Sequence, residues 1–203
     1  MRRVSLRLMC ILLFSCVLSG TPAATAEAAS SHKPQHTDVF VSGTDGYHTY
    51  RIPALIVTSK GTLLAFCEGR KKSRSDSGDI DLLLKRSKDG GRTWSKQYVV
   101  WNDIGNTCGN PCPVVDQQTG TIWLLMTWNR GDDRESAIKK NTSRDTRRVW
   151  VSRSDDDGAT WSKPAEITDT AKRPEWRWYA TGPGVGIQLQ TDYFVFGFYR
   201  KTL

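Results

Sequence analysis

Two arginines and one aspartate in the first half of the chain are the residues best suited to chemistry. Arg51 stands in the segment Tyr50-Arg51-Ile52-Pro53, and Arg70 ends the stretch Glu68-Gly69-Arg70. The planar guanidinium group of an arginine can bind both oxygens of a carboxylate, so arginines are suited to holding an anionic ligand. Asp76 lies in a polar loop between expected strands, where a carboxyl group can exchange a proton with a reacting atom.

Each of these residues also has an ordinary structural explanation. A lone arginine at the end of a strand is commonly solvated, and Arg70 begins the basic run Arg70-Lys71-Lys72. Asp76 is equally suited to an Asx turn. Asp79 and Asp81 rival Asp76 by composition, but they lead into the next apolar stretch, which favours a role in holding the loop or facing solvent.

An eight-residue pattern occurs twice further along the chain. Ser87–Trp94 and Ser154–Trp161 both read Ser-x-Asp-x-Gly-x-Thr-Trp. Ser and Asp side chains bond to nearby backbone N–H groups, and Gly accepts a positive φ, so we expect each copy to form a turn between strands. Repetition over a long period indicates repeated structural units. We assign the two copies a structural role and no catalytic one.

Short apolar stretches around these turns predict an all-β fold of repeated four-stranded units. The expected strands of the first unit are Ile52–Val57, Thr62–Cys67, Ile80–Arg86 and Gln97–Trp101. Those of the second are Cys112–Val115, Thr121–Thr127, Arg148–Ser152 and Pro164–Ile167, and a third unit begins with Val185–Leu189 and Tyr193–Tyr199. Helical periodicity of useful length is absent after the first residues. Such units predict a β-propeller, of which the chain supplies about two and a half blades.

These motifs together resemble the sialidases, which carry the repeated turn as the Asp box and an arginine in an Arg-Ile-Pro motif. The further stretches that match, in the order of that family, are Ala65–Arg70, Asp76–Arg86, Gly109–Asp116 and Gly182–Leu189. The resemblance implies a six-bladed β-propeller, of which residues 38–203 would be the N-terminal part. It also implies exo-α-sialidase activity, the hydrolysis of terminal sialic acids from glycoconjugates with retention, without a metal or organic cofactor.

The resemblance also implies roles for particular residues. Arg51 corresponds to the first of three arginines that bind the substrate carboxylate, and Arg70 lines the same site. Asp76 corresponds to the acid/base aspartate, which protonates the departing glycosidic oxygen and later activates water. Sialidases use a tyrosine nucleophile assisted by a glutamate. Those two residues and the other two arginines belong to later blades and are not assigned here, so we expect this polypeptide alone not to turn over substrate.

Three further residues are weaker candidates for lining the site. Asn110 corresponds to a residue near the N-acetyl pocket, Glu135 in the polar loop 131–136 is expected to reach the glycerol side chain, and Tyr199 is expected to line the site from the third blade. A turn, a solvated loop or core packing explains each of them equally well. The rival function for the whole protein is a non-catalytic propeller that binds glycans or proteins, because Asp boxes also occur in proteins that are not enzymes.

The first 26 residues have the pattern of a secretory signal. Three arginines in the first seven residues precede the apolar run Leu8–Leu18, which is too short to span a bilayer, and Ala24-Thr25-Ala26 fits a cleavage site. A lipoprotein signal ending at Cys16 is the second interpretation. We therefore expect a secreted or periplasmic protein with a flexible lead-in at residues 27–37, and no membrane-spanning segment after the signal is removed.

Charge and cysteine content narrow the function classes further. The formal net charge of +8 is spread along the chain, with a weak basic cluster only near 139–148, so nucleic-acid binding is not expected, whereas an anionic sugar is a suitable partner. Cys67 is expected to be a buried thiol, and Cys108 and Cys112 could pair across a short loop. The three histidines are all N-terminal, so no metal site is expected. The sequence does not indicate an oligomeric state.

Overall fold

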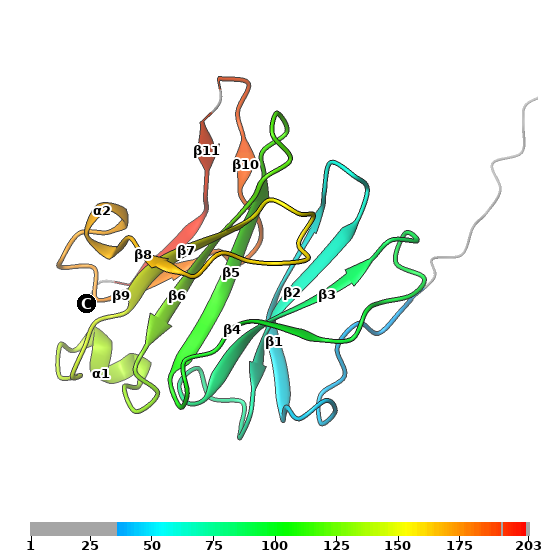
Figure 1. The fold of residues 1–203 in the computed structure, drawn as a ribbon. Coiled ribbons are helices and arrows are strands. Elements are labelled where there is room, and N and C mark those ends of the chain that lie inside the picture. The colour runs from blue at the N-terminus through cyan, green and yellow to red at the C-terminus, as the bar shows by residue number, and fades with distance from the viewer. Residues whose placement is uncertain (1–35, 192, 202–203) are drawn as a thin grey trace, which may run out of the picture. The chain divides into compact units, whose positions relative to one another are not determined.

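The computed structural model describes residues 36–191 and 193–201, and in this part of the chain strands dominate and form three successive groups (Figure 1). The expected signal at residues 1–26 and most of the expected lead-in lie outside the described residues. Neither helix in the described part is long and apolar enough to cross a membrane.

The first two groups are antiparallel four-stranded blades. The first blade consists of β1 (Thr49–Val57), β2 (Leu63–Arg70), β3 (Ile80–Ser87) and β4 (Tyr98–Trp101). The second consists of β5 (Thr107–Val115), β6 (Ile122–Asn129), β7 (Arg148–Ser154) and β8 (Ala165–Glu166). A single parallel pair, Ile80 with Thr107, connects the two blades. The expected all-β architecture of repeated blades is therefore confirmed.

The third group differs from the single hairpin that was expected. It contains β9 (Trp178–Thr181), β10 (Ile187–Gln188), β11 (Phe194–Val195) and β12 (Phe198–Lys201), with β9 paired to β12 and β10 paired to β11. Strand β9 was not predicted, because it has only four residues and Gly182 follows it directly, which leaves no alternating pattern long enough to be seen.

Two short helices were also not predicted. They are α1 (Glu135–Lys139) and α2 (Thr168–Ala171), and elements of this length show no periodicity in a sequence. The prediction that Glu135 lies in a loop over residues 131–136 is therefore wrong. The loop ends at Arg134, and Glu135 begins α1.

The main apolar core lies between the first two blades. It combines side chains of β1, β2 and β3 with those of β6, among them Phe66, Leu84 and Met126, which are fully buried. A smaller cluster of Tyr47, Cys67 and Leu83 lies elsewhere in the first blade, with Phe40 packed against it. Because β2 and β3 contribute side chains to both clusters, they have nearly continuous apolar sequences instead of an alternating pattern.

The two Asp boxes form the expected turns. In the first, Asp89 accepts hydrogen bonds from the backbone N–H of Thr93 at 2.9 Å and from the hydroxyl of Ser87 at 2.8 Å. In the second, Asp156 accepts the equivalent bonds from Thr160 and Ser154. Both boxes begin at the last residue of a strand, Ser87 of β3 and Ser154 of β7, at the end of each blade opposite to loops 71–79 and 130–147 (Figure 1). Their structural role is therefore supported by their contacts.

The two cysteines of the second blade do not lie in a loop. Cys108 and Cys112 are both in β5, both are buried, and both are free thiols, as Cys67 is. The suggestion that they pair across a short loop is therefore wrong. Burial raises the pKa of all three thiols, that of Cys112 to about 11.

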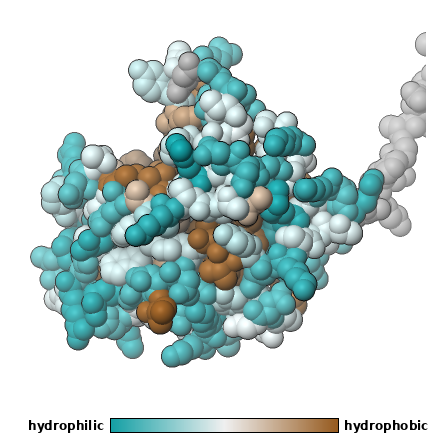
Figure 2. All heavy atoms as spheres, viewed as in Figure 1, coloured by the Kyte–Doolittle hydropathy of each residue, from teal (hydrophilic) through white to brown (hydrophobic). Residues whose placement is uncertain are grey.

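The surface on the face shown in Figure 2 is mostly hydrophilic, with apolar residues in a few separate groups. Among the larger exposed apolar side chains of the described residues are Leu55 and Val57 of β1, the edge strand of the sheet, and Val185 and Ile187 near β10. These four residues also line a shallow groove between β1, β5 and β10.

Candidate active site

A pocket of about 220 Å³ lies at the end of the blades opposite to the Asp boxes. All six residues predicted from the sequence line it: Arg51, Arg70, Asp76, Asn110, Glu135 and Tyr199. They come from β1, β2, loop 71–79, β5, α1 and β12, and the pocket wall is completed by Ile52, Glu68, Arg147, Trp178, Ala180 and Pro183. The structure thus brings every predicted site residue to one place, while their chemical roles stay predictions.

Two arginines converge on one oxygen of Asp76. Oδ1 of Asp76 accepts a hydrogen bond from Nη1 of Arg51 at 3.0 Å and lies 2.7 Å from Nη2 of Arg70. The side chains of Arg51 and Asp76 are 43% and 49% exposed, whereas that of Arg70 is 2% exposed. The site therefore combines one fixed and one accessible guanidinium group with a carboxyl group that is open to solvent.

A bulge in β1 positions Arg51. The pairing of β1 with β2 shifts between Arg51 and Ala54, and Ile52 between them has a φ of 55°. A β-branched residue is unfavourable in this left-handed region, and such backbone strain is typical of functional sites. Pro53 lies in the same bulge of an edge strand, where its missing N–H group breaks no ladder bond. The bulge changes the direction of the Arg51 side chain relative to a regular strand.

Strand β5 has a corresponding irregularity at Asn110. Its pairing with β6 shifts between Gly109 and Cys112, and Asn110 has a φ of 52°, which asparagine tolerates better than most residues. Asn110 is buried, and its backbone N–H donates to Oε1 of Glu68 at 3.0 Å. Gly109 must be a glycine because a Cβ atom there would collide with the Glu68 carboxylate.

Glu68 fixes Arg70 in a buried ion pair. Its Oε2 accepts from Nη2 of Arg70 at 2.6 Å and from Nε at 3.1 Å, while Nη1 of Arg70 donates to the carbonyl of Arg74 at 2.6 Å. Arg70 is thus unlike Lys72 in the same basic run, which is exposed. Glu68 was not predicted from the sequence, although a charged residue within the apolar strand 63–70 is a usable signal.

Arg147 is a second residue that the sequence analysis missed. It is buried, donates from Nη2 to Oδ1 of Asn110 at 2.6 Å and from Nε to Thr127 at 3.1 Å, and lies over the ring of Trp178 at 4.1 Å. Burial lowers the pKa of Arg147 to about 10, against the opposing effect of Glu68, so Arg147 remains charged near neutral pH. Its neighbour Arg148 instead pairs with Asp145 and Glu166.

Glu135 and Tyr199 reach the pocket from its rim. Glu135 forms an ion pair with Lys139 within α1, and Tyr199 of β12 pairs with Ala180 of β9 and is half exposed. Asp79 and Asp81 are not among the pocket's lining residues. Asp79 and buried Asp81 both pair with Lys71, at 2.9 Å and 3.2 Å, and so hold the start of loop 71–79.

Metal ligands are not grouped in this region. Within residues 36–191 and 193–201, no set of three or more His, Cys, Asp or Glu side chains is arranged to hold a metal ion. The guanidinium groups of the pocket can bind an anion, and its accessible carboxyl group can transfer a proton.

Comparison with known proteins shows that this chain is similar to sialidases. Residues 61–202 match the BNR repeat-like domain. The exo-alpha-sialidase of Aspergillus fumigatus is 38% identical over 167 residues, which cover 74% of this chain and 41% of that protein. The sialidase of Micromonospora viridifaciens is 34% identical over 202 residues, which cover 93% of this chain and 31% of that protein.

A solved structure gives the same result. The Hadza microbial sialidase Hz136 superposes with a TM-score of 0.69 and 32% identity, over 78% of this chain and 34% of that chain. The chain therefore spans 41% of the length of the fungal relative and smaller shares of the other two. Because the domain match covers most of the chain and the relatives agree in kind, the chain belongs to the sialidase family with BNR repeats.

Proposed function

We propose that the protein is an exo-α-sialidase, which hydrolyses terminal sialic acids from glycoconjugates with retention of configuration. The observation that carries this proposal is the convergence of Arg51 and Arg70 on the carboxylate of Asp76 in one pocket. Sialic acid carries a carboxylate on its anomeric carbon, so an arginine that can exchange one carboxylate partner for another is suited to bind it. A propeller that only binds glycans has no need of a carboxyl group between two arginines.

In this proposal the substrate carboxylate displaces Asp76 from Arg51. Arg51 is accessible enough for this exchange, whereas Arg70 is held in place by Glu68. Asp76, once released from Arg51, lies next to the glycosidic oxygen and donates a proton to the leaving sugar, and it then takes a proton from the attacking water. Sialidases use a tyrosine as nucleophile. A neutral phenol suits this substrate because a carboxylate nucleophile would be repelled by the substrate's own carboxylate.

The proposed partner is a sialylated glycan, and the proposed location is the periplasm or the exterior of the cell. The location rests on the signal pattern of residues 1–26 alone.

Binding of two matched ligands tests the role of Arg51. The ligands are a sialic acid analogue with its carboxylate and the same analogue with a neutral carboxamide, and calorimetry measures both dissociation constants. Arg51→Ala is expected to weaken carboxylate binding by roughly 1.5–3 kcal/mol and carboxamide binding much less, because a hydrogen bond between two charged groups is lost only in the first case. Arg92→Ala, which removes an exposed arginine of the first Asp box, serves as the control. Equal losses for both ligands would contradict the proposal.

A further inference from the structure

A second pocket of about 490 Å³ adjoins the candidate active site on the other side of Asp76. The two pockets share Asp76 and Glu135, and the second is otherwise lined by Ser75, Ser77, Arg134, Ser136, Lys139 and Lys140. Its volume lies within the range of about 300–1,000 Å³ that is typical of ligand pockets. Asp76 of loop 71–79 and Glu135 of α1 therefore lie where the two pockets adjoin.

The position of Asp76 assigns the two spaces to different sugars. If Asp76 protonates the glycosidic oxygen, the bond that breaks lies at the boundary that Asp76 forms. The terminal sugar then occupies the arginine-lined pocket with Arg51, and the sugar on the other side of that bond occupies the second pocket. This step rests on the proposed function, because it takes Asp76 as the proton donor.

The side chains around the second pocket carry an excess of positive charge. The two carboxylates of its wall are already paired, Asp76 with Arg51 and Arg70, and Glu135 with Lys139. Arg134 and Lys140 are exposed, and the ion pairs of residues 36–191 and 193–201 include neither of them. The carboxylate of nearby Asp132 is paired with Arg130 and Arg144 instead.

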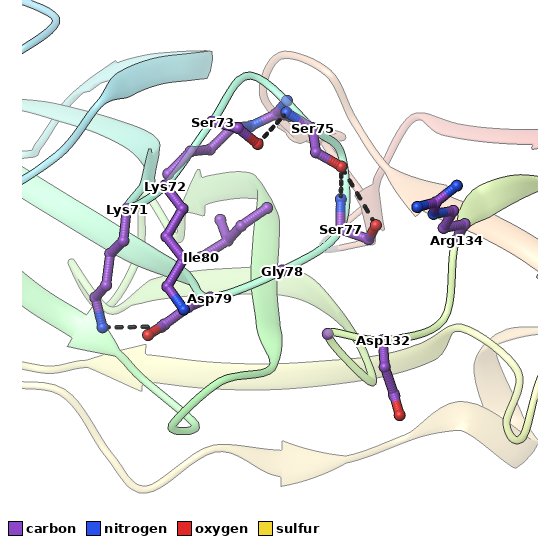
Figure 3. A pocket seen from close by; sticks show the side chains of 12 residues that line it. Lys71, Lys72, Ser73, Ser75, Ser77, Gly78, Asp79, Ile80, Asp132 and Arg134 are labelled. Carbon is purple, nitrogen blue, oxygen red and sulfur yellow. Dashed lines mark hydrogen bonds and ion pairs between the residues drawn. The ribbon is translucent and has the colours of Figure 1, made fainter.

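Hydroxyl groups accompany these two cations. Figure 3 shows Arg134 at the start of α1 with its guanidinium group directed toward Ser75 and Ser77 on the opposite loop. The hydroxyls of Ser75 and Ser77 contact each other at 3.3 Å, so one donates to the other and the second keeps its O–H free to donate to an anion. Arg134 and both serines also line the neighbouring pocket of about 380 Å³ on the other side of the loop, at whose edge Lys72 is exposed. Two cations outside the ion pairs of the described residues, Arg134 and Lys140, and one free hydroxyl donor thus line one space next to the scissile bond.

We propose that this second pocket is a subsite for an acidic sugar, in which Arg134 and Lys140 bind an anionic group on the residue next to the terminal sialic acid. The anion is either the carboxylate of a second sialic acid or a sulfate ester, because both present oxygens that guanidinium and ammonium groups recognise. A neutral sugar offers these donors only hydroxyl groups, so it lacks the charge–charge attraction that an acidic sugar gains from them.

The test compares three ligands that share the terminal sialic acid. They are sialyllactose, which has a neutral second sugar, a disialylated lactose with two sialic acids in sequence, and a sialyllactose sulfated on the second sugar. Calorimetry with the full chain measures each dissociation constant at low and high salt. We expect at least one acidic ligand to bind about ten-fold more tightly than sialyllactose at low salt, and the advantage to shrink at high salt. The acidic ligand that shows this advantage identifies the anion as the carboxylate of a second sialic acid or as a sulfate ester.

Two double variants decide whether the pocket causes the difference. Arg134→Ala with Lys140→Ala is expected to remove most of the advantage of the acidic ligand. Lys88→Ala with Lys96→Ala removes the same charge from exposed positions within and just after the first Asp box and is expected to keep the advantage. The inference is overturned if sialyllactose binds as tightly as both acidic ligands, or if the two double variants weaken the acidic ligand equally. If none of the three sialosides binds, the proposed function fails together with the inference.

Discussion

The carboxylate of Glu68 and the guanidinium group of Arg70 form a buried ion pair with Oε2 and Nη2 only 2.6 Å apart. The two residues are two positions apart in β2, so their side chains leave the same face of the strand. The second oxygen of Glu68 accepts the backbone N–H of Asn110 in β5, so the pair also connects the first blade to the second. Glu68 is thus a positioning residue, which holds Arg70 at the wall of the pocket.

Glu68→Ala should destabilise the protein strongly. The substitution leaves the buried Arg70 without its main partner and Asn110 without an acceptor, and breaking a buried pair typically costs about 3–5 kcal/mol in the free energy of unfolding. Glu68→Gln keeps the shape and should lose less. Urea denaturation measures both variants, and Glu175→Ala at an exposed position is the control. Equal stability of Glu68→Ala and the control would show that the pair is not buried in solution.

Asp157→Ala should loosen the contact between the blades. Asp157 follows the aspartate of the second Asp box, and its oxygens accept from Thr58 at 2.5 Å and Thr62 at 2.7 Å in the first blade. Losing these bonds should lower the free energy of unfolding by roughly 1–3 kcal/mol. Asp155→Ala is the matched control, because Asp155 is exposed and contacts Thr121 and Arg153 of its own blade. Equal losses in thermal or urea denaturation would count against a contact between blades.

Asp156→Ala should make stability less dependent on acidic pH. Hydrogen bonds from the side chain and then the backbone of Thr160, opposed by slight burial, lower the pKa of Asp156 from 3.8 to about 2. Because the pKa of Asp156 is lower in the folded state than in the unfolded state, Asp156 stabilises the fold at pH values above its unfolded-state pKa. This contribution is lost as the pH falls toward 2. The variant should therefore be less stable at pH 6, with a difference that shrinks between pH 4 and pH 2. Unfolding curves across this range that stay a constant distance apart would refute this account.

Asp76→Ala should affect substrates according to their leaving groups. A natural sugar leaving group needs a proton to depart. In any preparation that hydrolyses sialosides, the kcat/KM of Asp76→Ala for natural sialosides should therefore fall roughly 100- to 10,000-fold. A nitrophenyl group leaves as a stable anion and should lose far less. Asp79→Ala is the control, because Asp79 binds Lys71 and does not line the pocket. A selective loss in Asp79→Ala would assign the acid to that residue, and no selectivity in either variant would place the acid elsewhere.

Features that depend on neighbouring residues were predictable from the sequence. The Asp-box turns follow from Ser, Asp and Gly at fixed spacing, because their hydrogen bonds form within the box itself. The strands of the first two blades follow from short apolar stretches between such turns, and the family resemblance identified six residues that the structure brings to one pocket.

Features that depend on distant parts of the chain were decided only by the tertiary structure. Arg147 faces the pocket while Arg148 faces outward, and Arg70 is buried while Lys72 is exposed, although each pair looks alike in the sequence. Successive side chains in a strand point to opposite faces, so a bulge such as the one at Ile52 reverses which residue reaches the site. The hydrogen bond from Asn110 to Glu68 and the contacts of Asp157 likewise require two blades to be packed together. The sequence by itself therefore determined the fold family and the candidate residues, and blade packing determined which charges meet in the pocket.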